Sequence, residues 1–193
     1  CDNQALTIDK MYDFVFSENS LFIDEGRNLL ITEFGKNYGT YFSILSEIAN
    51  GHYTQGEIES ALGGTAIGGY LSKLENVYNL ITRERPIFAK PGTKKNVRYV
   101  IGDNFLNFWF KYIEQNRSYI ELQNFDDLRQ LAKADYPTYS GRVLEKYFKQ
   151  KLAETGGFKE IGSWWETKSS IGKQRINSYE IDIVALKSSG KKA

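Results

Sequence analysis

The stretch TQGEIESALGGTAIGGYLSKLENVYNL, residues 54–80, decides the fold that this sequence predicts. Thr54 is followed three residues later by Glu57, which is the spacing of a capping box and predicts that a helix begins here. After a glycine-rich turn, apolar residues recur at helical spacing at Ile67, Leu71, Leu74 and Tyr78. We therefore expect two helices joined by a tight turn. GGTAIGG is read as this turn and not as a phosphate-binding loop, because it lacks the Lys-Ser/Thr pair.

The neighbouring segments extend this pattern in both directions. YGTYFSILSEIANG, residues 38–51, has apolar residues at helical spacing and ends at Gly51. ITRERPIFAKPGTKKNVRYVIGD, residues 81–103, predicts a strand, a turn rich in Pro, Gly and Lys, and a second strand. Three helices followed by a two-stranded hairpin is the order of a winged helix-turn-helix, which we place at residues 36–115.

The segment before this module, residues 6–35, predicts two short helices. Asp24 or Glu25 is a candidate for the start of the second helix, and Gly35 is a candidate for its end. These two helices are too short to form a core alone, so we expect them to pack on another part of the chain.

The segments after the hairpin add helices and then two strands. DNFLNFWFKYIEQN, residues 103–116, predicts an aromatic helix of the core with its first residue, Asp103, as the N-cap. Further helices are expected at 125–134 and 140–154, and strands at 158–166 and 178–186. The predicted fold class is α+β, with a mostly helical winged helix-turn-helix followed by an α/β domain.

Composition narrows the classes of function. The 193 residues carry a net charge of +1, so any nucleic-acid site must come from local clustering of charge. A single cysteine, Cys1, excludes an intrachain disulfide. His52 is the sole histidine, which leaves no ligand set for zinc and no convincing Ser-His-Asp or Cys-His site. No apolar run is long enough to span a membrane, so we expect a cytoplasmic protein without a membrane partner.

The last strand carries two acids that need an explanation. Alternation along a strand predicts that Glu180 and Asp182 share one face with Val184 and Leu186, opposite an apolar face. An unpaired buried charge is costly, so these acids either face solvent, pair with Lys or Arg, or hold a divalent metal. The residues alone leave these alternatives open.

Basic residues gather in the predicted hairpin. They are Arg83, Arg85, Lys90, Lys94, Lys95 and Arg98, against the single acid Glu84. Such a patch suits contacts with the phosphates of duplex DNA, which position a protein without specifying sequence. The alternative is a solvated hairpin with no ligand.

The second helix of residues 54–80 gives a weaker signal for DNA. Its predicted outer face shows Thr65, Gly69, Ser72, Lys73 and Asn76, of which one is cationic. Thr65, Ser72 and Lys73 are our candidate DNA contacts there, although base readout usually uses Arg, Lys, Asn or Gln. The alternative is a winged helix that packs against another domain.

Several segments together resemble a known family. They are LFIDEGRNLLITEF, YFSILSEIANG, LSKLENVYNLITRERPIF, YVIGDNFLNFWFKYIEQNRS, GRVLEKYFKQKL, IGSWW and EIDIVAL. In this order they resemble the C-terminal half of the archaeal-type AAA+ ATPases, which also occur in bacteria. The resemblance implies that residues 1–35 are the tail of the ATPase lid. It also implies that residues 116–193 are a domain of unknown function with a restriction-endonuclease-like core, truncated here.

The resemblance also implies roles for the acids. In the PD-(D/E)xK nuclease core, Glu145 on a helix and Asp182 on a strand would be Mg²⁺ ligands of the full-length protein, with Glu180 as their catalytic neighbour. The acid-x-Lys strand of that pattern would follow Ala193. Because the chain starts with Cys and stops after a strand, we expect a fragment that is itself inactive.

Three functions follow from the resemblance for the full-length protein. ATP would bind an N-terminal ATPase module that this chain lacks, since it has no G-x-x-x-x-G-K-[ST] loop. The leading expectation is a winged helix that contacts duplex DNA non-specifically beside a nuclease-like domain. The alternatives are a protein-interaction module that regulates the ATPase without binding DNA, and a metal-dependent nuclease.

Overall fold

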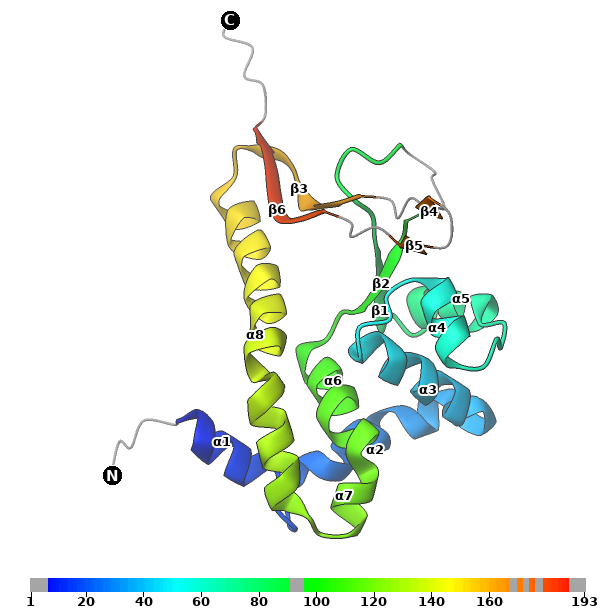
Figure 1. The fold of residues 1–193 in the computed structure, drawn as a ribbon, viewed down its shortest axis with the longest axis vertical. Coiled ribbons are helices and arrows are strands. Elements are labelled where there is room, and N and C mark those ends of the chain that lie inside the picture. The colour runs from blue at the N-terminus through cyan, green and yellow to red at the C-terminus, as the bar shows by residue number, and fades with distance from the viewer. Residues whose placement is uncertain (1–6, 91–95, 167–169, 172–173, 176–178, 188–193) are drawn as a thin grey trace, which may run out of the picture. The chain divides into compact units, whose positions relative to one another are not determined.

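The computed structural model describes residues 7–90, 96–166, 170–171, 174–175 and 179–187 (Figure 1). The chain divides into two compact units. Unit 1 comprises Cys1–Thr82 and Tyr99–Pro137, and unit 2 comprises Arg83–Arg98 and Thr138–Ala193. The fold is mostly helical with small two-stranded sheets, so the α+β class predicted from the sequence is confirmed. Among the described residues, no helix combines the length and the apolar character needed to cross a membrane.

Unit 1 is built mainly of helices. In chain order these are α1 (Ile8–Val15), α2 (Phe22–Phe34), the 3-10 turn η1 (Gly35–Asn37), α3 (Tyr38–Ala49), α4 (Gln55–Ala61), α5 (Gly68–Asn76), α6 (Asn104–Phe108), the π-helical turn η2 (Trp109–Ile113), the 3-10 turn η3 (Glu114–Asn116) and α7 (Arg117–Glu121). Strands β1 (Ile81–Glu84) and β2 (Arg98–Ile101) pair, and the border between the units passes through both. The predicted order of three helices and a hairpin is therefore present.

Local capping explains where these helices begin and end. At α4 the backbone N–H of Glu57 donates to Thr54 Oγ1 at 3.3 Å, and the N–H of Thr54 donates to the Glu57 carboxylate at 3.0 Å, which confirms the capping box. The N–H of Leu106 donates to Asp103 Oδ1 at 2.8 Å, which confirms the predicted cap of α6. Helix α2 ends at Gly35, as predicted, where φ is +57°.

The start of α2 differs from the prediction. The helix begins at Phe22, not at Asp24 or Glu25. Both acids lie in its first turn, where a negative charge interacts favourably with the helix dipole. The acids therefore mark the first turn and not the cap.

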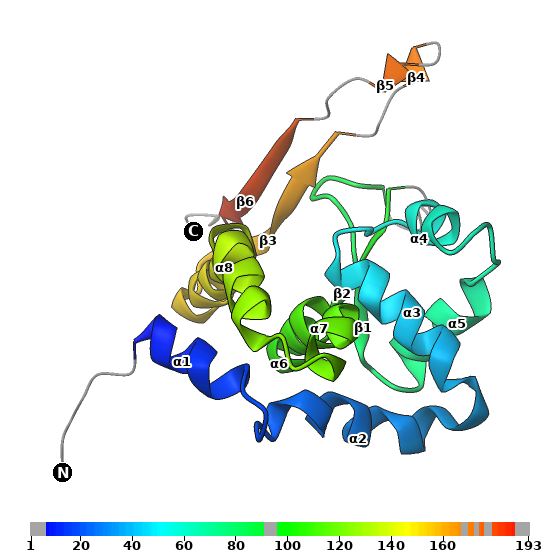
Figure 2. The same ribbon diagram turned by 60° about the horizontal axis from the view of Figure 1, so that its bottom comes forward.

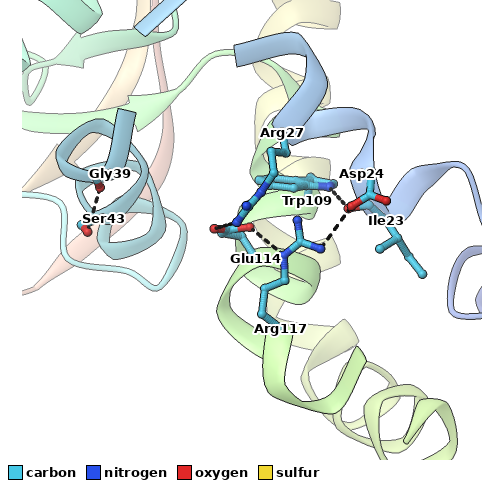
Figure 3. Close-up of polar contacts among 8 residues, drawn as sticks. All are labelled: Ile23, Asp24, Arg27, Gly39, Ser43, Trp109, Glu114 and Arg117. Carbon is cyan, nitrogen blue, oxygen red and sulfur yellow. Dashed lines mark hydrogen bonds and ion pairs between the residues drawn. The ribbon is translucent and has the colours of Figure 1, made fainter. Parts of the chain in front are cut away.

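The core of unit 1 is aromatic and centres on η2. Trp109, Phe110, Tyr112 and Ile113 are all 0% exposed, which confirms the predicted core role of this segment. Phe42 of α3 packs edge-on against Trp109 and Phe110, with ring centroids 5.9 and 5.3 Å apart. The indole N–H of Trp109 donates to the carbonyl of Ile23 at 3.1 Å, so α2 packs on this core as expected (Figure 3).

A chain of ion pairs borders this aromatic core (Figure 3). Glu114 lies 3.4 Å from Arg27 and 3.5 Å from Arg117, and Arg117 also contacts Asp24 at 3.2 Å. These contacts link η3 and α7 to helix α2. They extend the attachment that the Trp109 indole makes to the same helix.

Helix α8 (Phe125–Thr155) corrects the prediction of two helices at 125–134 and 140–154. It is one continuous helix with Pro137 inside it, and the border between the units falls at this residue. A proline inside a helix removes one backbone hydrogen bond and favours a break. Here Leu128 and Ala132 are fully buried before Pro137, and Glu145 and Lys149 contact strand β3 after it. Packing on both sides outweighs the local preference.

Unit 2 contains the hairpin residues 83–98, the second half of α8 and the C-terminal strands. These are β3 (Phe158–Trp165), β4 (Ser170–Ile171), β5 (Gln174–Arg175) and β6 (Glu180–Lys187). Strands β3 and β6 pair antiparallel and lie side by side as a ribbon (Figure 2). Both strands were predicted at these places in the sequence.

The contact between Gly26 and Trp109 gives a test of the core. A Cβ added to Gly26 would overlap three atoms of the buried Trp109 ring, whereas a Cβ at Gly39 would meet no atom within 4 Å. We expect Gly26→Ala to lower the free energy of unfolding by about 3 kcal/mol through overpacking. Gly39→Ala is the matched control and should raise it by up to about 1 kcal/mol. Urea melts of both variants would measure this, and equal stability of the two would contradict the packing.

Candidate nucleic-acid interface

The pairing of β3 with β6 contains a β-bulge at the predicted acids. Trp165 lies opposite Glu180 and Trp164 opposite Ile181, but the next recorded pair is Gly162 with Val184. Two residues of β6, Asp182 and Ile183, therefore face the single residue Ser163. An extra residue on one strand of this kind bends the strand and disrupts the ladder locally.

The bulge corrects the predicted faces of the last strand. Cross-strand partners project from the same face of a sheet, so Glu180 shares the face of Trp165. Val184 shares the face of Gly162, and Trp165 and Gly162 are three residues apart on β3, which places them on opposite faces. Glu180 and Val184 thus do not share a face, as strict alternation had predicted.

Glu180 is engaged by an arginine of the hairpin. Both terminal nitrogens of Arg98 donate to the two carboxylate oxygens of Glu180, and the Nη2–Oε2 distance is 3.0 Å. The guanidinium carbon also lies 4.2 Å from the ring centroid of Trp165, the cross-strand partner of Glu180. We call this arrangement of Arg98, Glu180 and Trp165 the clasp.

The clasp changes the acidity of Glu180. The hydrogen bonds from Arg98 lower the pKa of the Glu180 carboxyl below its usual 4.5, against an opposing effect of burial. The positive charges of Arg98, Lys149 and Arg142 lower the pKa further. Glu180 is therefore held as a carboxylate by its surroundings.

Glu145, the predicted metal ligand on α8, is engaged by a second polar group. Lys149, one helical turn along, forms an ion pair with Glu145 and also contacts Ser163 Oγ. The Ser163 hydroxyl donates to Glu145 Oε1 at 3.1 Å, and Ser163 is 6% exposed. The structure thus brings Glu145 to the β3 residue that faces the bulge containing Asp182.

These acids do not form a metal centre within the described part of the chain. No group of three or more His, Cys, Asp or Glu side chains there could hold a metal ion. Asp182 is exposed and makes no hydrogen bond or ion pair with the residues that the structure describes. The Mg²⁺ assignment of Glu145 and Asp182 stays a prediction.

The hairpin packs against β3 through its first arm. The N–H of Ile87 donates to the Ser163 carbonyl at 2.8 Å, and Ile87 is 4% exposed. Arg83, Arg85 and Lys90 of the hairpin are exposed, whereas Arg98 belongs to the clasp. Lys94 and Lys95 lie outside the described residues.

The other candidate DNA contacts lie in unit 1, with Ser72 and Lys73 on helix α5 and Thr65 in the segment that precedes it. The predicted stripe of Ile67, Leu71 and Leu74 is buried, and Tyr78 is half-buried. Ser72 and Lys73 are exposed, as expected for the outer face of the helix. Thr65 is also exposed, but the prediction that it lies on the helix is wrong, because α5 begins at Gly68. The Thr65 hydroxyl donates to the Leu62 carbonyl at 3.0 Å, so it ends a turn locally. Their role in DNA binding stays a prediction.

Three residues of this region were missed by sequence reasoning. Lys149 lies four residues after Glu145, a spacing that signals an ion pair on a helix. Ser163 and Trp165 gave no such signal, because their roles depend on strand register.

Charge is strongly segregated between the two units. Counted over its sequence, unit 2 has 17 Lys and Arg against 7 Asp and Glu, while unit 1 has 8 Lys and Arg against 17 Asp and Glu. The overall charge of +1 therefore conceals a basic unit of net charge +10 and an acidic unit of net charge −9. Such a local excess attracts polyanions even in a neutral chain.

Comparisons with known proteins connect the chain to proteins without an assigned function. Residues 109–193 match the model of the family DUF234, described as archaeal and bacterial proteins of unknown function. An uncharacterized protein of Methanocaldococcus jannaschii is 39% identical over 163 residues, which cover 80% of this chain and 34% of that relative. The chain thus spans about a third of the length of the curated relative that it matches. No solved structure matches.

The pKa of Glu180 offers a direct test of the clasp. We expect the pKa of the Glu180 carboxyl to lie below 4.5 in the wild type. In Arg98→Gln this pKa should return toward its usual value, because the hydrogen bonds from Arg98, the main cause of the shift, are removed. Since the folded pKa is depressed, the stability that this group contributes is present above the unfolded pKa and is lost as pH falls through the folded pKa. NMR titration of the side-chain carboxyl would measure both forms. An identical pKa in both proteins would contradict the contact.

Proposed function

We propose that unit 2 is part of a larger AAA+-type ATPase and binds the phosphate backbone of duplex DNA. The segregation of charge supports this most strongly, because 17 basic residues against 7 acidic ones give unit 2 the potential that a polyanion requires. Binding of this kind depends on neutralising phosphates and needs no base readout. ATP would bind elsewhere in the longer protein.

The hairpin is the part of unit 2 that would meet the DNA. Arg85 and Lys90 are exposed on it, while Ile87 and Arg98 attach its two arms to β3 and β6. The order α3, α4, α5, β1, β2 supports a winged helix, with this hairpin as the wing. The exposed face of α5 has few base-reading side chains, which fits non-specific binding.

Salt dependence tests the proposal in the full-length protein. We expect Arg85→Ala and Lys90→Ala each to weaken duplex binding about equally for unrelated sequences. Each should also reduce the slope of log affinity against log salt by about 1, because one phosphate contact is lost. Fluorescence anisotropy at several salt concentrations would measure this.

Lys36→Ala is the matched control. Lys36 is an exposed lysine of unit 1, so its loss should change neither the affinity nor the slope. If the wild-type protein bound duplex DNA with no salt dependence, or did not bind it, the DNA proposal would fail. A protein-interaction module that regulates the ATPase would then be the better account.

A metal-dependent nuclease is the second candidate function. The observation in its favour is that the bulge places Asp182 and Ile183 opposite Ser163, whose hydroxyl binds Glu145. The described residues supply these two carboxylates without a third ligand, and Lys149 already neutralises Glu145. Any complete metal site would thus need groups from elsewhere in the longer protein.

Cleavage assays distinguish this second candidate. If the full-length protein cuts DNA with Mg²⁺, we expect Asp182→Ala to abolish cutting while binding persists, because a metal ligand would be lost. Glu160→Ala removes another exposed acid of the same sheet and should leave cutting unchanged. Absence of cutting by the wild-type protein with any divalent metal would exclude the nuclease.

A further inference from the structure

We propose that Glu180 and Arg98 are positioning residues that hold the wing hairpin for DNA, and that Arg98 is not itself a phosphate contact. This inference rests on the proposed DNA binding of unit 2 and assigns different roles to different cations of the hairpin. Arg85 and Lys90 would meet phosphate, while Arg98 would fix the hairpin that carries them.

The two arms of the hairpin are attached at neighbouring points of one sheet. The first arm is attached by the Ile87 N–H on the Ser163 carbonyl at 2.8 Å, and the second by Arg98 on Glu180. Ser163 and Trp165 lie two residues apart on the same face of β3, and Trp165 is the partner of Glu180. Lys90 lies in the sequence between the two attachments, so loss of one attachment would leave its position less fixed.

The geometry leaves Arg98 little capacity for a second anion. Both of its terminal nitrogens donate to Glu180, and the ring of Trp165 lies against its guanidinium. Its side chain is 23% exposed. A phosphate contact would require breaking a bidentate pair, which is the stronger kind of charge-assisted hydrogen bond.

An ordinary surface ion pair would not carry this role. Isolated pairs between exposed side chains contribute little, since solvent screens them and two flexible chains must be ordered. The clasp differs because it is bidentate and stacked on Trp165, which is 7% exposed. Lys149 and Arg142 add positive potential at Glu180.

The variant Glu180→Gln distinguishes this proposal from a purely electrostatic effect, because the two predict opposite changes in DNA affinity. It removes an acid from a basic surface, so simple electrostatics predicts tighter DNA binding. If Glu180 holds the hairpin, binding should instead weaken by about 3- to 10-fold, because the competent hairpin position is populated less. The slope of log affinity against log salt should stay that of the wild type, because the Arg85 and Lys90 contacts are retained.

Two further variants serve as controls in the full-length protein. Glu160→Gln makes the same charge change at an exposed acid of β3, and should bind DNA as tightly as the wild type or slightly more tightly. The charge-reversed double variant Arg98→Glu/Glu180→Arg restores an ion pair, and should recover most of the affinity that either single change loses.

Amide hydrogen exchange of Ile87 supplies a readout that does not need DNA. We expect faster exchange in Glu180→Gln, since the hairpin loses one of its attachments. This separates the two hypotheses: if the wild-type protein binds no DNA, the proposed function fails, while altered exchange would still show that the clasp holds the hairpin. If Glu180→Gln does not fold by circular dichroism, Glu180→Asp replaces it, with a smaller loss of the same sign.

The inference is overturned by either of two results. The first is DNA binding by Glu180→Gln that equals or exceeds that of the wild type, with unchanged exchange at Ile87. The second is a fall of about 1 in the salt slope for Arg98→Gln, which would make Arg98 a phosphate contact.

Discussion

Buried Ser163 joins three segments of unit 2 through one residue. Its carbonyl accepts from Ile87 of the hairpin, its hydroxyl contacts Glu145 and Lys149 of α8, and its place on β3 faces the bulge of β6. Each of these contacts uses a different polar atom or a different edge of the residue. The hairpin, the helix and the last strand of unit 2 therefore share one point of attachment, and a shift of β3 would disturb all three.

The segment that Ser163 helps to attach belongs to the basic unit of the chain. Unit 1 buries a large aromatic core and carries most of the acids, while unit 2 carries most of the basic residues. A net charge of +1 alone would give little electrostatic attraction to a polyanion such as DNA. The hairpin residues 83–98 belong to the basic unit, together with the second half of α8 and the C-terminal strands.

Local signals predicted much of the fold, and long-range pairing determined the rest. The capping box at Thr54, the cap at Asp103 and the aromatic core around Trp109 depend on residues close in sequence or on strong hydrophobicity. The continuity of α8 through Pro137 could not be predicted, since tertiary contacts outweigh a local breaker. The bulge at Asp182 has no glycine or proline on β6 to mark it, and its place depends on the register with β3. The pairing of Arg98 with Glu180 joins residues 82 positions apart, and no periodicity signals such a contact.

The pairing of β3 with β6 also gives Glu180 and Asp182 different surroundings, although both acids were assigned to one site from the sequence. Glu180 and Asp182 looked like a pair of acids on one face, and the resemblance assigned both to cutting. The bulge and the clasp give them different surroundings, because Glu180 is held by Arg98 while Asp182 is exposed on the bulged segment. The proposed holding of the hairpin and the predicted coordination of a metal would therefore depend on different residues of the same strand. Because their contacts differ, variants of Glu180 and of Asp182 test the proposed DNA binding and the proposed cutting separately.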